Sequence, residues 1–136
     1  MSKKRITSIE IHMHSGGLCS PEEILAEKVF VYRSGKIKHK LFNGLSEIAI
    51  QEFEYKVRKL DVEDFFIYIA TKIKIEEWKS DYSEQVCDGW YWFFKIRYSN
   101  HQVTNISGTI ESPPNAKQLV KKIKKLTKFE VDPWIF

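Results

Sequence analysis

The stretch from Trp90 to Tyr98 constrains the fold of this chain more than any other. Its side chains alternate, so that one set of positions is wholly apolar or aromatic and the other set is mixed. The first set is Trp90, Trp92, Phe94, Ile96 and Tyr98, and the second set is Tyr91, Phe93, Lys95 and Arg97. Alternation with period two among aromatic residues is typical of a β-strand with one buried face. We therefore expect the first set to face the core and the second set to face a groove or solvent.

The pattern elsewhere predicts an antiparallel sheet built largely from hairpins. Further strands are expected over residues 6–14, 28–33, 36–42 and 103–111. Each is rich in β-branched or aromatic residues and is bounded by turn signals. Residues 46–60 fit either a helix or a strand with a bulge near Gln51, and their β-branched and aromatic content favours the strand. The capping box Ser20-Pro21-Glu22-Glu23 fits the start of a two-turn helix or an ordered loop.

Two longer stretches have the apolar periodicity of helices. Residues 61–77 carry an apolar stripe at helical spacing, and Asp61 is expected to cap the first turn. Residues 116–128 follow Pro113-Pro114 and place apolar residues opposite a lysine face. That face consists of Lys117, Lys121, Lys122, Lys124 and Lys125. We expect one α+β domain over residues 1–136, an antiparallel sheet of about five to six strands with two main helices packed on one face.

Composition indicates the location and source of the protein more than its activity. The net charge is +4, with basic ends and an acidic middle that can attract one another in the fold. No stretch approaches the ~20 apolar residues of a membrane span, and no leader-like run follows the basic start. We therefore expect a cytoplasmic protein without a membrane partner, with Cys19 and Cys87 as thiols. The abundance of lysine and isoleucine is typical of proteins from AT-rich genomes and predicts a bacterial source.

His12 and His14 are the sharpest candidates for chemistry. On a strand, side chains two apart project to the same side, where two imidazoles can share a metal ion. Together with the following Ser15 and the Pro-Glu-Glu stretch, they resemble the first motif of the polymerase and histidinol phosphatase family of metal-dependent hydrolases. The resemblance implies metal-ligand roles for His12 and His14 only. The histidines downstream, His39 and His101, are too few for the later ligand motifs of that family.

The two cysteines suggest further chemistry that their surroundings disfavour. His12, His14, Cys19 and Cys87 have the ligand types that zinc prefers, but their spacing matches no known zinc arrangement. Asp88 adjoins Cys87, and its negative charge would raise the pKa of that thiol and make it a poorer nucleophile. The sequence therefore predicts no catalytic residue, no cofactor and no metal site, and it leans against an enzyme.

The C-terminal half carries a second resemblance. The strand at residues 90–98, the triplet Ser107-Gly108-Thr109, Pro113-Pro114 and the striped helix are together similar to the C-terminal half of several small uncharacterised bacterial proteins. Some of those proteins are found among toxin-neutralising immunity proteins, which implies a protein-binding role. Immunity proteins against nucleases are often acidic because they cover a basic active site, whereas this chain is basic.

The sequence predicts a non-enzymatic protein-binding or regulatory module with its contact surface at Tyr91, Phe93, Lys95 and Arg97. Large aromatic residues and arginine are enriched at interfaces, which is the basis of this choice. One alternative is a hydrolase using His12 and His14. The other is nucleic-acid binding through the C-terminal helix, although a lysine face opposite an apolar stripe is typical of any docked helix. The apolar end Trp134-Ile135-Phe136 is expected to dock on the domain or to form a subunit contact.

Overall fold

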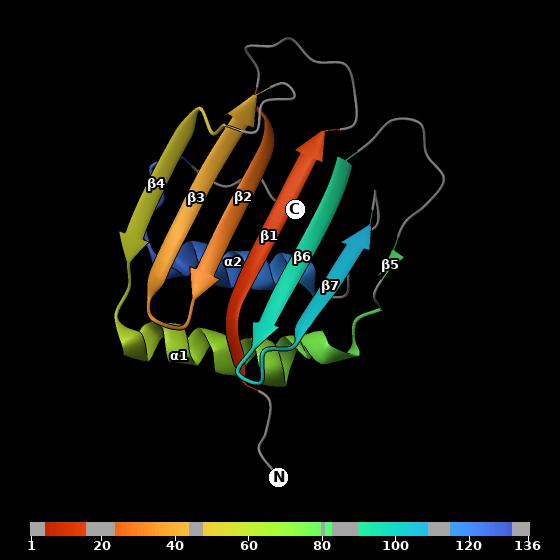
Figure 1. Ribbon diagram of the computed structural model, residues 1–136. Coiled ribbons are helices and arrows are strands. Elements are labelled where there is room, and N and C mark those ends of the chain that lie inside the picture. Colours follow the sequence, from red (N-terminus) through yellow and green to blue (C-terminus); the bar gives the residue numbers. More distant parts are fainter. Residues whose placement is uncertain are drawn as a thin grey trace.

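The fold is a single twisted sheet with helices on one side. The computed structural model describes residues 5–15, 24–43, 48–79, 81–82, 90–108 and 115–131. The strands are β1 (Ile6–Ser15), β2 (Ile24–Tyr32), β3 (Lys36–Asn43), β4 (Gln51–Lys56), β5 (Asp81–Tyr82), β6 (Trp90–Tyr98) and β7 (Val103–Gly108). Their order across the sheet is β4-β3-β2-β1-β6-β7-β5 (Figure 1). All neighbours are antiparallel except the two-residue β5, which runs parallel to β7.

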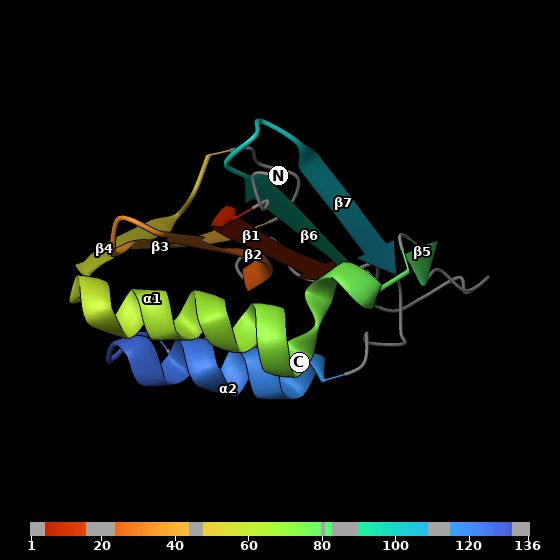
Figure 2. The same cartoon turned by 90° about the horizontal axis from the view of Figure 1, so that it is seen from below.

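Two helices cover one face of this sheet. They are α1 (Lys59–Tyr68) and α2 (Ala116–Leu126), and both lie on the same side of the strands (Figure 2). The π-helical segment η1 (Ile69–Ile73) and the 3-10 turn η2 (Ile75–Glu77) extend α1. The expected fold class, an antiparallel sheet with two main helices on one face, is therefore confirmed. None of the helices described is long and apolar enough to cross a membrane.

The core lies between the sheet and the two helices. Fully buried side chains come from the strands, from both helices and from η1: Ile9, Ile11, Val29, Val31, Ile37, Phe94, Ile96, Phe65, Ile69 and Leu119. The predicted inner stripe of the last helix is confirmed, with Ala116, Val120 and Ile123 also buried. β1 runs through the centre, because it pairs with β2 on one side and with β6 on the other. β6, the strand that the sequence predicts most clearly, therefore lies beside the N-terminal strand β1.

The turn between β2 and β3 shows why its glycine is needed. Gly35 has a φ of 100°, a left-handed conformation that side chains rarely adopt. A Cβ atom at this position would collide with the backbone carbonyl of Val57. The amide of Val57 donates to the carbonyl oxygen of Gly35 at 2.8 Å. The turn is thereby attached to the segment that leads from β4 into α1.

The structure corrects several expected boundaries. Residues 46–60 do contain a strand, but β4 covers only Gln51–Lys56 and α1 already begins at Lys59. The cap assigned to Asp61 is wrong, because Arg58 occupies the N-cap position and its guanidinium donates to the Asp61 carboxylate at 2.9 Å. The helix expected to run to residue 77 changes its hydrogen bonding after Tyr68. Lys74, with a φ of 56°, separates its π-helical and 3-10 parts.

Other expectations fall partly or wholly outside the described residues. β2 begins at Ile24, so a two-turn helix after Pro21 does not fit, while residues 16–23 are not described. β7 ends at Gly108, and the last residues of the strand expected to reach residue 111 are not described. The C-terminal Trp134, Ile135 and Phe136 also lie outside, so their docking or subunit role stays a prediction.

Candidate functional site

The sheet face opposite the helices is the candidate site, and we call it the open face. Figure 2 shows both helices on the other side of the strands. The cross-strand register assigns to the open face Ser8, Glu10, His12, Lys28, Phe30, Tyr32, Lys38, Lys40, Glu52, Glu54, Tyr91, Phe93, Lys95, Arg97, Asn105 and Ser107. The surface predicted from the sequence, Tyr91 with Phe93, Lys95 and Arg97, lies wholly on this face.

The alternation in β6 separates core from surface as expected. Trp92, Phe94, Ile96 and Tyr98 are all buried against the helices, and the Trp90 side chain lies outside the described part. On the other side, Tyr91 is 36% exposed, while Phe93, Lys95 and Arg97 are half-buried. The four predicted residues are therefore accessible to a ligand, and they are not part of the core.

Four rings form a continuous band across three strands, which we call the aromatic strip. It consists of Tyr32, Phe30, His12 and Phe93. The ring centroids are 6.4 Å apart from Tyr32 to Phe30, 6.1 Å from Phe30 to His12 and 5.3 Å from His12 to Phe93. Sequence reasoning placed only Phe93 on a contact surface, and it singled out His12 as a possible metal ligand. The other three lie on β1 and β2, and nothing in the local pattern shows that β1 separates β2 from β6.

Cations lie on both sides of the aromatic strip. Lys28, Lys38 and Lys40 come from β2 and β3, and Lys95 and Arg97 come from β6. Lys40 pairs with Glu52 at 3.2 Å, and Arg97 pairs with Glu10. Within the described part of the chain, Lys28, Lys38 and Lys95 form no ion pair. The cations among these open-face residues therefore outnumber the carboxylates, although Glu10 lies opposite Lys95 and Glu54 opposite Lys38 in the register.

A short polar network of Glu10, Arg97 and His12 lies next to the aromatic strip. The Glu10 side chain, only 10% exposed, accepts from the Arg97 guanidinium and lies 3.3 Å from His12 Nε2. Burial raises the pKa of Glu10, but the hydrogen bonds and charges of Arg97 and then His12 outweigh burial and hold it below 4.5. Burial and the charge of Lys28 lower the pKa of His12 below 6.5, and Glu10 only partly opposes them. His12 is accordingly a neutral ring at pH 7.

We expect acid to destabilise the protein through these two groups in succession. Because the pKa of His12 is lowered on folding, the unfolded chain binds its proton first, and stability falls as the pH drops below 6.5. Because the pKa of Glu10 is also lowered, a second loss begins below 4.5 and is complete once the folded-state pKa is passed. Urea unfolding between pH about 8 and about 3, with NMR titration of both side chains, measures these steps.

The variant Arg97→Gln provides the control for this pH dependence. Removing the guanidinium takes away the main group that lowers the pKa of Glu10, so this pKa should rise and the loss below 4.5 should shrink. The step from His12 should remain. A wild-type His12 that titrates at or above 6.5 would contradict the prediction.

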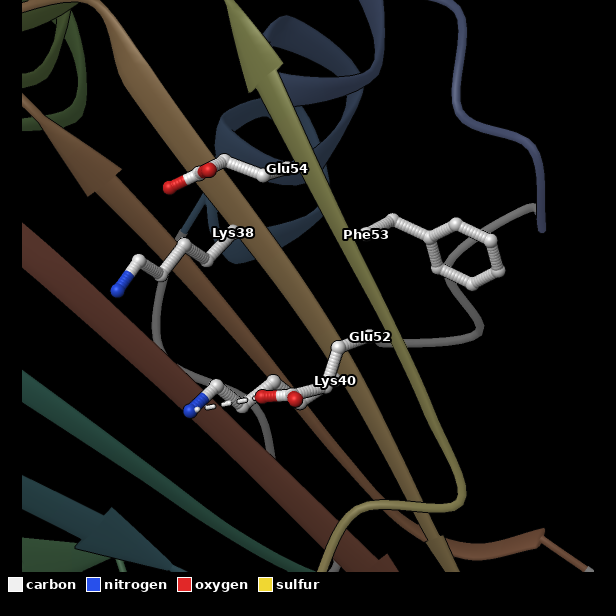
Figure 3. Close-up of a pocket in the computed structure, with 5 residues that line it drawn as sticks. All are labelled: Lys38, Lys40, Glu52, Phe53 and Glu54. Carbon is white, nitrogen blue, oxygen red and sulfur yellow. Dashed lines mark ion pairs between the residues drawn. The ribbon is translucent and has the colours of Figure 1, made fainter.

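Two shallow depressions border the open face at β3 and β4. One, of about 310 Å³, is lined by Lys28, Phe30, Lys40, Phe42, Ile48, Ala49 and Glu52. The other, of about 220 Å³, shares Lys40 and Glu52 with it. Figure 3 shows Lys40 beside Glu52, with Phe53 projecting to the opposite side of β4. Neither depression encloses a small molecule, and their position suits a ligand that lies along the surface.

The proposed metal ligands are not brought together by the described structure. His12 contacts Glu10, as stated above, and His14 belongs to β1 although its side chain is not described. Cys19 and Cys87 lie outside the described ranges. Among the residues whose placement is described, no group of three histidine, cysteine or acidic side chains could hold a metal ion. The hydrolase alternative therefore depends on sequence resemblance alone.

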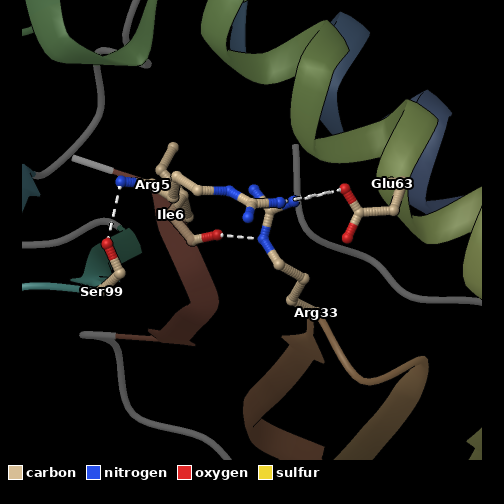
Figure 4. Close-up of polar contacts among 5 residues, drawn as sticks. All are labelled: Arg5, Ile6, Arg33, Glu63 and Ser99. Carbon is tan, nitrogen blue, oxygen red and sulfur yellow. Dashed lines mark hydrogen bonds and ion pairs between the residues drawn. The ribbon is translucent and has the colours of Figure 1, made fainter. Parts of the chain in front are cut away.

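Two further polar clusters hold the fold together. Arg33 donates to the Ile6 carbonyl at 2.7 Å and to Glu63 at 2.6 Å, which connects β1 and β2 to α1 (Figure 4). On the helix side, Glu27 and His39 lie fully buried with Glu27 Oε2 2.6 Å from His39 Nε2. Since neither member of that pair reaches solvent, it has no access to a substrate and its role is structural.

Comparisons with known proteins assign no family to this chain. No protein-family model matches it, and no curated protein matches it either. The similarity to small bacterial proteins described for the C-terminal half stays a prediction. The open face is therefore the feature from which function has to be argued.

Proposed function

We propose that this protein is a non-enzymatic binding module that holds a macromolecular ligand against the open face of its sheet. The observation that supports the proposal is the aromatic strip, which lies on a face that none of the described helices covers and is bordered by cations. Contiguous ring surfaces left accessible on a folded domain mark interaction sites. Aromatic residues and arginine are also the residues most enriched at interfaces.

The carboxylates of the open face support binding over catalysis. Glu10 is held by Arg97, Glu52 lies 3.2 Å from Lys40, and Glu54 lies 3.2 Å from Lys36. Arg97 and His12 hold the pKa of Glu10 below its usual value despite burial, so this carboxylate is a poor proton acceptor for a reaction. The proposal keeps the four residues predicted from the sequence and extends the contact surface to β1 and β2.

A site-specific crosslinking experiment tests this proposal without assuming what the ligand is. A photoreactive amino acid is placed at Tyr91 on the open face, and in a matched variant at Ile67, which is 56% exposed on α1. In cells of the native host, ultraviolet light should produce a discrete adduct from position 91 and none from position 67. Replacing Lys38 and Lys95 by glutamate in the first variant should abolish the adduct.

Either of two results would contradict the binding-module proposal. One is the absence of an adduct from position 91 when the variant is folded and expressed at its normal level. The other is an adduct that forms equally from positions 91 and 67, which would show that contact is not confined to the open face.

A further inference from the structure

We propose that the ligand of the open face is single-stranded nucleic acid, with bases stacked on the aromatic strip and phosphates against the cations around it. This inference rests on the binding-module proposal and names its ligand class. Three observations support the inference: a row of flat rings, positive charge on both sides of that row, and a shallow depression beside it.

The rings provide the stacking surface. Tyr32, Phe30, His12 and Phe93 follow one another across β2, β1 and β6 at centroid spacings of 5.3–6.4 Å. Every base has a flat face, so stacking on such rings tolerates any sequence. Sheet-based RNA-binding domains stack two or three bases on aromatic side chains in the same manner. Because the pKa of His12 is lowered, its ring is uncharged at neutral pH and does not interrupt the strip with a buried charge.

The cations lie where the phosphates of a nucleic-acid backbone running along the aromatic strip would need them. Lys38 is the cross-strand neighbour of Phe30 on one side, and Lys28 is the neighbour of His12. Lys95 and Arg97 lie on β6 on the other side. Lysines without a carboxylate partner in the described structure can exchange counterions for phosphates, which is the main electrostatic gain in nucleic-acid binding.

The face fits unpaired bases better than a duplex or a protein. A duplex covers the flat faces of its bases by stacking, so only its phosphates could reach the open face. An acidic protein surface would pair with the lysines, and aromatic residues are common at protein interfaces, but unpaired bases match a continuous row of four flat rings with cations on both sides better. The depression of about 310 Å³ between Phe30, Phe42 and Lys28 offers an additional place for one base beside the strip.

This inference moves the nucleic-acid hypothesis away from the C-terminal helix. On α2, Lys122 and Lys125 line one depression with Asp61 and Asp64 of α1, so acidic groups are close at hand. Lys122 also lies 5.0 Å from the centre of the Tyr68 ring. Binding through the lysines of α2 and binding through the lysines of the open face therefore predict different effects of substitution. A matched pair of variants, one on each surface, distinguishes the two.

The test uses fluorescence anisotropy of a labelled single strand of about 16 nucleotides, as DNA and as RNA, with the full chain. We expect binding that weakens with salt and is stronger than binding to the duplex of the same sequence. The double variant Lys38→Gln/Lys95→Gln should reduce the slope of log affinity against log salt by about 1.4. The control Lys117→Gln/Lys121→Gln removes the same charge from α2 and should leave the slope unchanged.

A variant that keeps all charges tests the stacking part. Phe93→Leu retains an apolar side chain but removes the flat ring, and we expect affinity to fall about fivefold or more. Circular dichroism and thermal unfolding of each variant establish that it is folded. An unchanged affinity of folded Phe93→Leu would overturn the stacking role and with it this inference.

Further outcomes separate this inference from the broader proposal. Lack of binding to either single strand at low salt, or an equal loss in the control pair, would overturn the nucleic-acid inference. An adduct from position 91 that resists nuclease and contains a second polypeptide would also overturn it and identify a protein partner, while the binding-module proposal would stand. An adduct from position 91 that nuclease removes would support both.

Discussion

Replacing Glu27 by leucine should lower the free energy of unfolding by about 3–5 kcal/mol, the largest effect expected for a single polar residue here. Glu27 and His39 are both 0% exposed and approach to 2.6 Å. His39 Nδ1 already has no partner among the described residues, so losing Glu27 leaves the imidazole buried without this hydrogen bond. A buried polar group without a partner loses its hydration and gains nothing in return.

The surroundings of this pair explain why water cannot replace the missing group. The ring centroid of Phe129 lies 5.5 Å from that of His39 and 5.2 Å from that of Tyr55. The Glu130 amide donates to the Tyr55 hydroxyl at 2.9 Å, which keeps the segment after α2 in place over the pair. Rings therefore cover the imidazole on the helix side of the sheet.

Urea unfolding of Glu27→Leu and of a matched control measures this effect. The control is Glu54→Gln, because Glu54 belongs to an exposed ion pair with Lys36, and such pairs contribute about 0–1 kcal/mol. The double variant Glu27→Leu/His39→Phe should regain much of the loss, since two apolar residues can replace a buried pair. If Glu27→Leu and Glu54→Gln cost the same, the pair is hydrated and the prediction is wrong.

The second large effect concerns two neighbours in β6. Phe94→Ala should cost about 3–5 kcal/mol, because Phe94 is 0% exposed and its ring lies 5.2 Å from that of Trp78 and 5.7 Å from that of Trp92. Phe93→Ala should cost only about 1 kcal/mol, since Phe93 is half-buried on the open face. Thermal and urea unfolding of the two variants measure the difference.

Equal costs for Phe93→Ala and Phe94→Ala would contradict the division between core and surface. They would indicate that the open face is covered by some other part of the molecule. The same pair of positions also separates stability from function. A ligand of the open face should lose affinity in Phe93→Ala and retain it in whatever fraction of Phe94→Ala remains folded.

Much of the fold follows from local pattern. The alternation in Trp92, Phe94 and Ile96, and the stripe of Leu119 and Ile123, arise because a strand repeats every two residues and a helix every 3.6. Those periodicities are properties of short stretches, so the sequence shows them directly. The helix start at Lys59 and the change to π-helical bonding after Tyr68 were not predicted, because end geometry depends on contacts with the rest of the domain.

The sequence by itself determined which side of β6 is apolar, and so it identified Tyr91, Phe93, Lys95 and Arg97 as surface residues. Only the tertiary structure placed His12 between Phe30 and Phe93, because the order β2-β1-β6 decides which side chains become neighbours. The contact between Glu27 and His39 likewise depends on the tertiary structure, because these residues lie on the neighbouring strands β2 and β3. Strand order is chosen by the packing of the whole core, whereas alternation is set within each strand by backbone geometry.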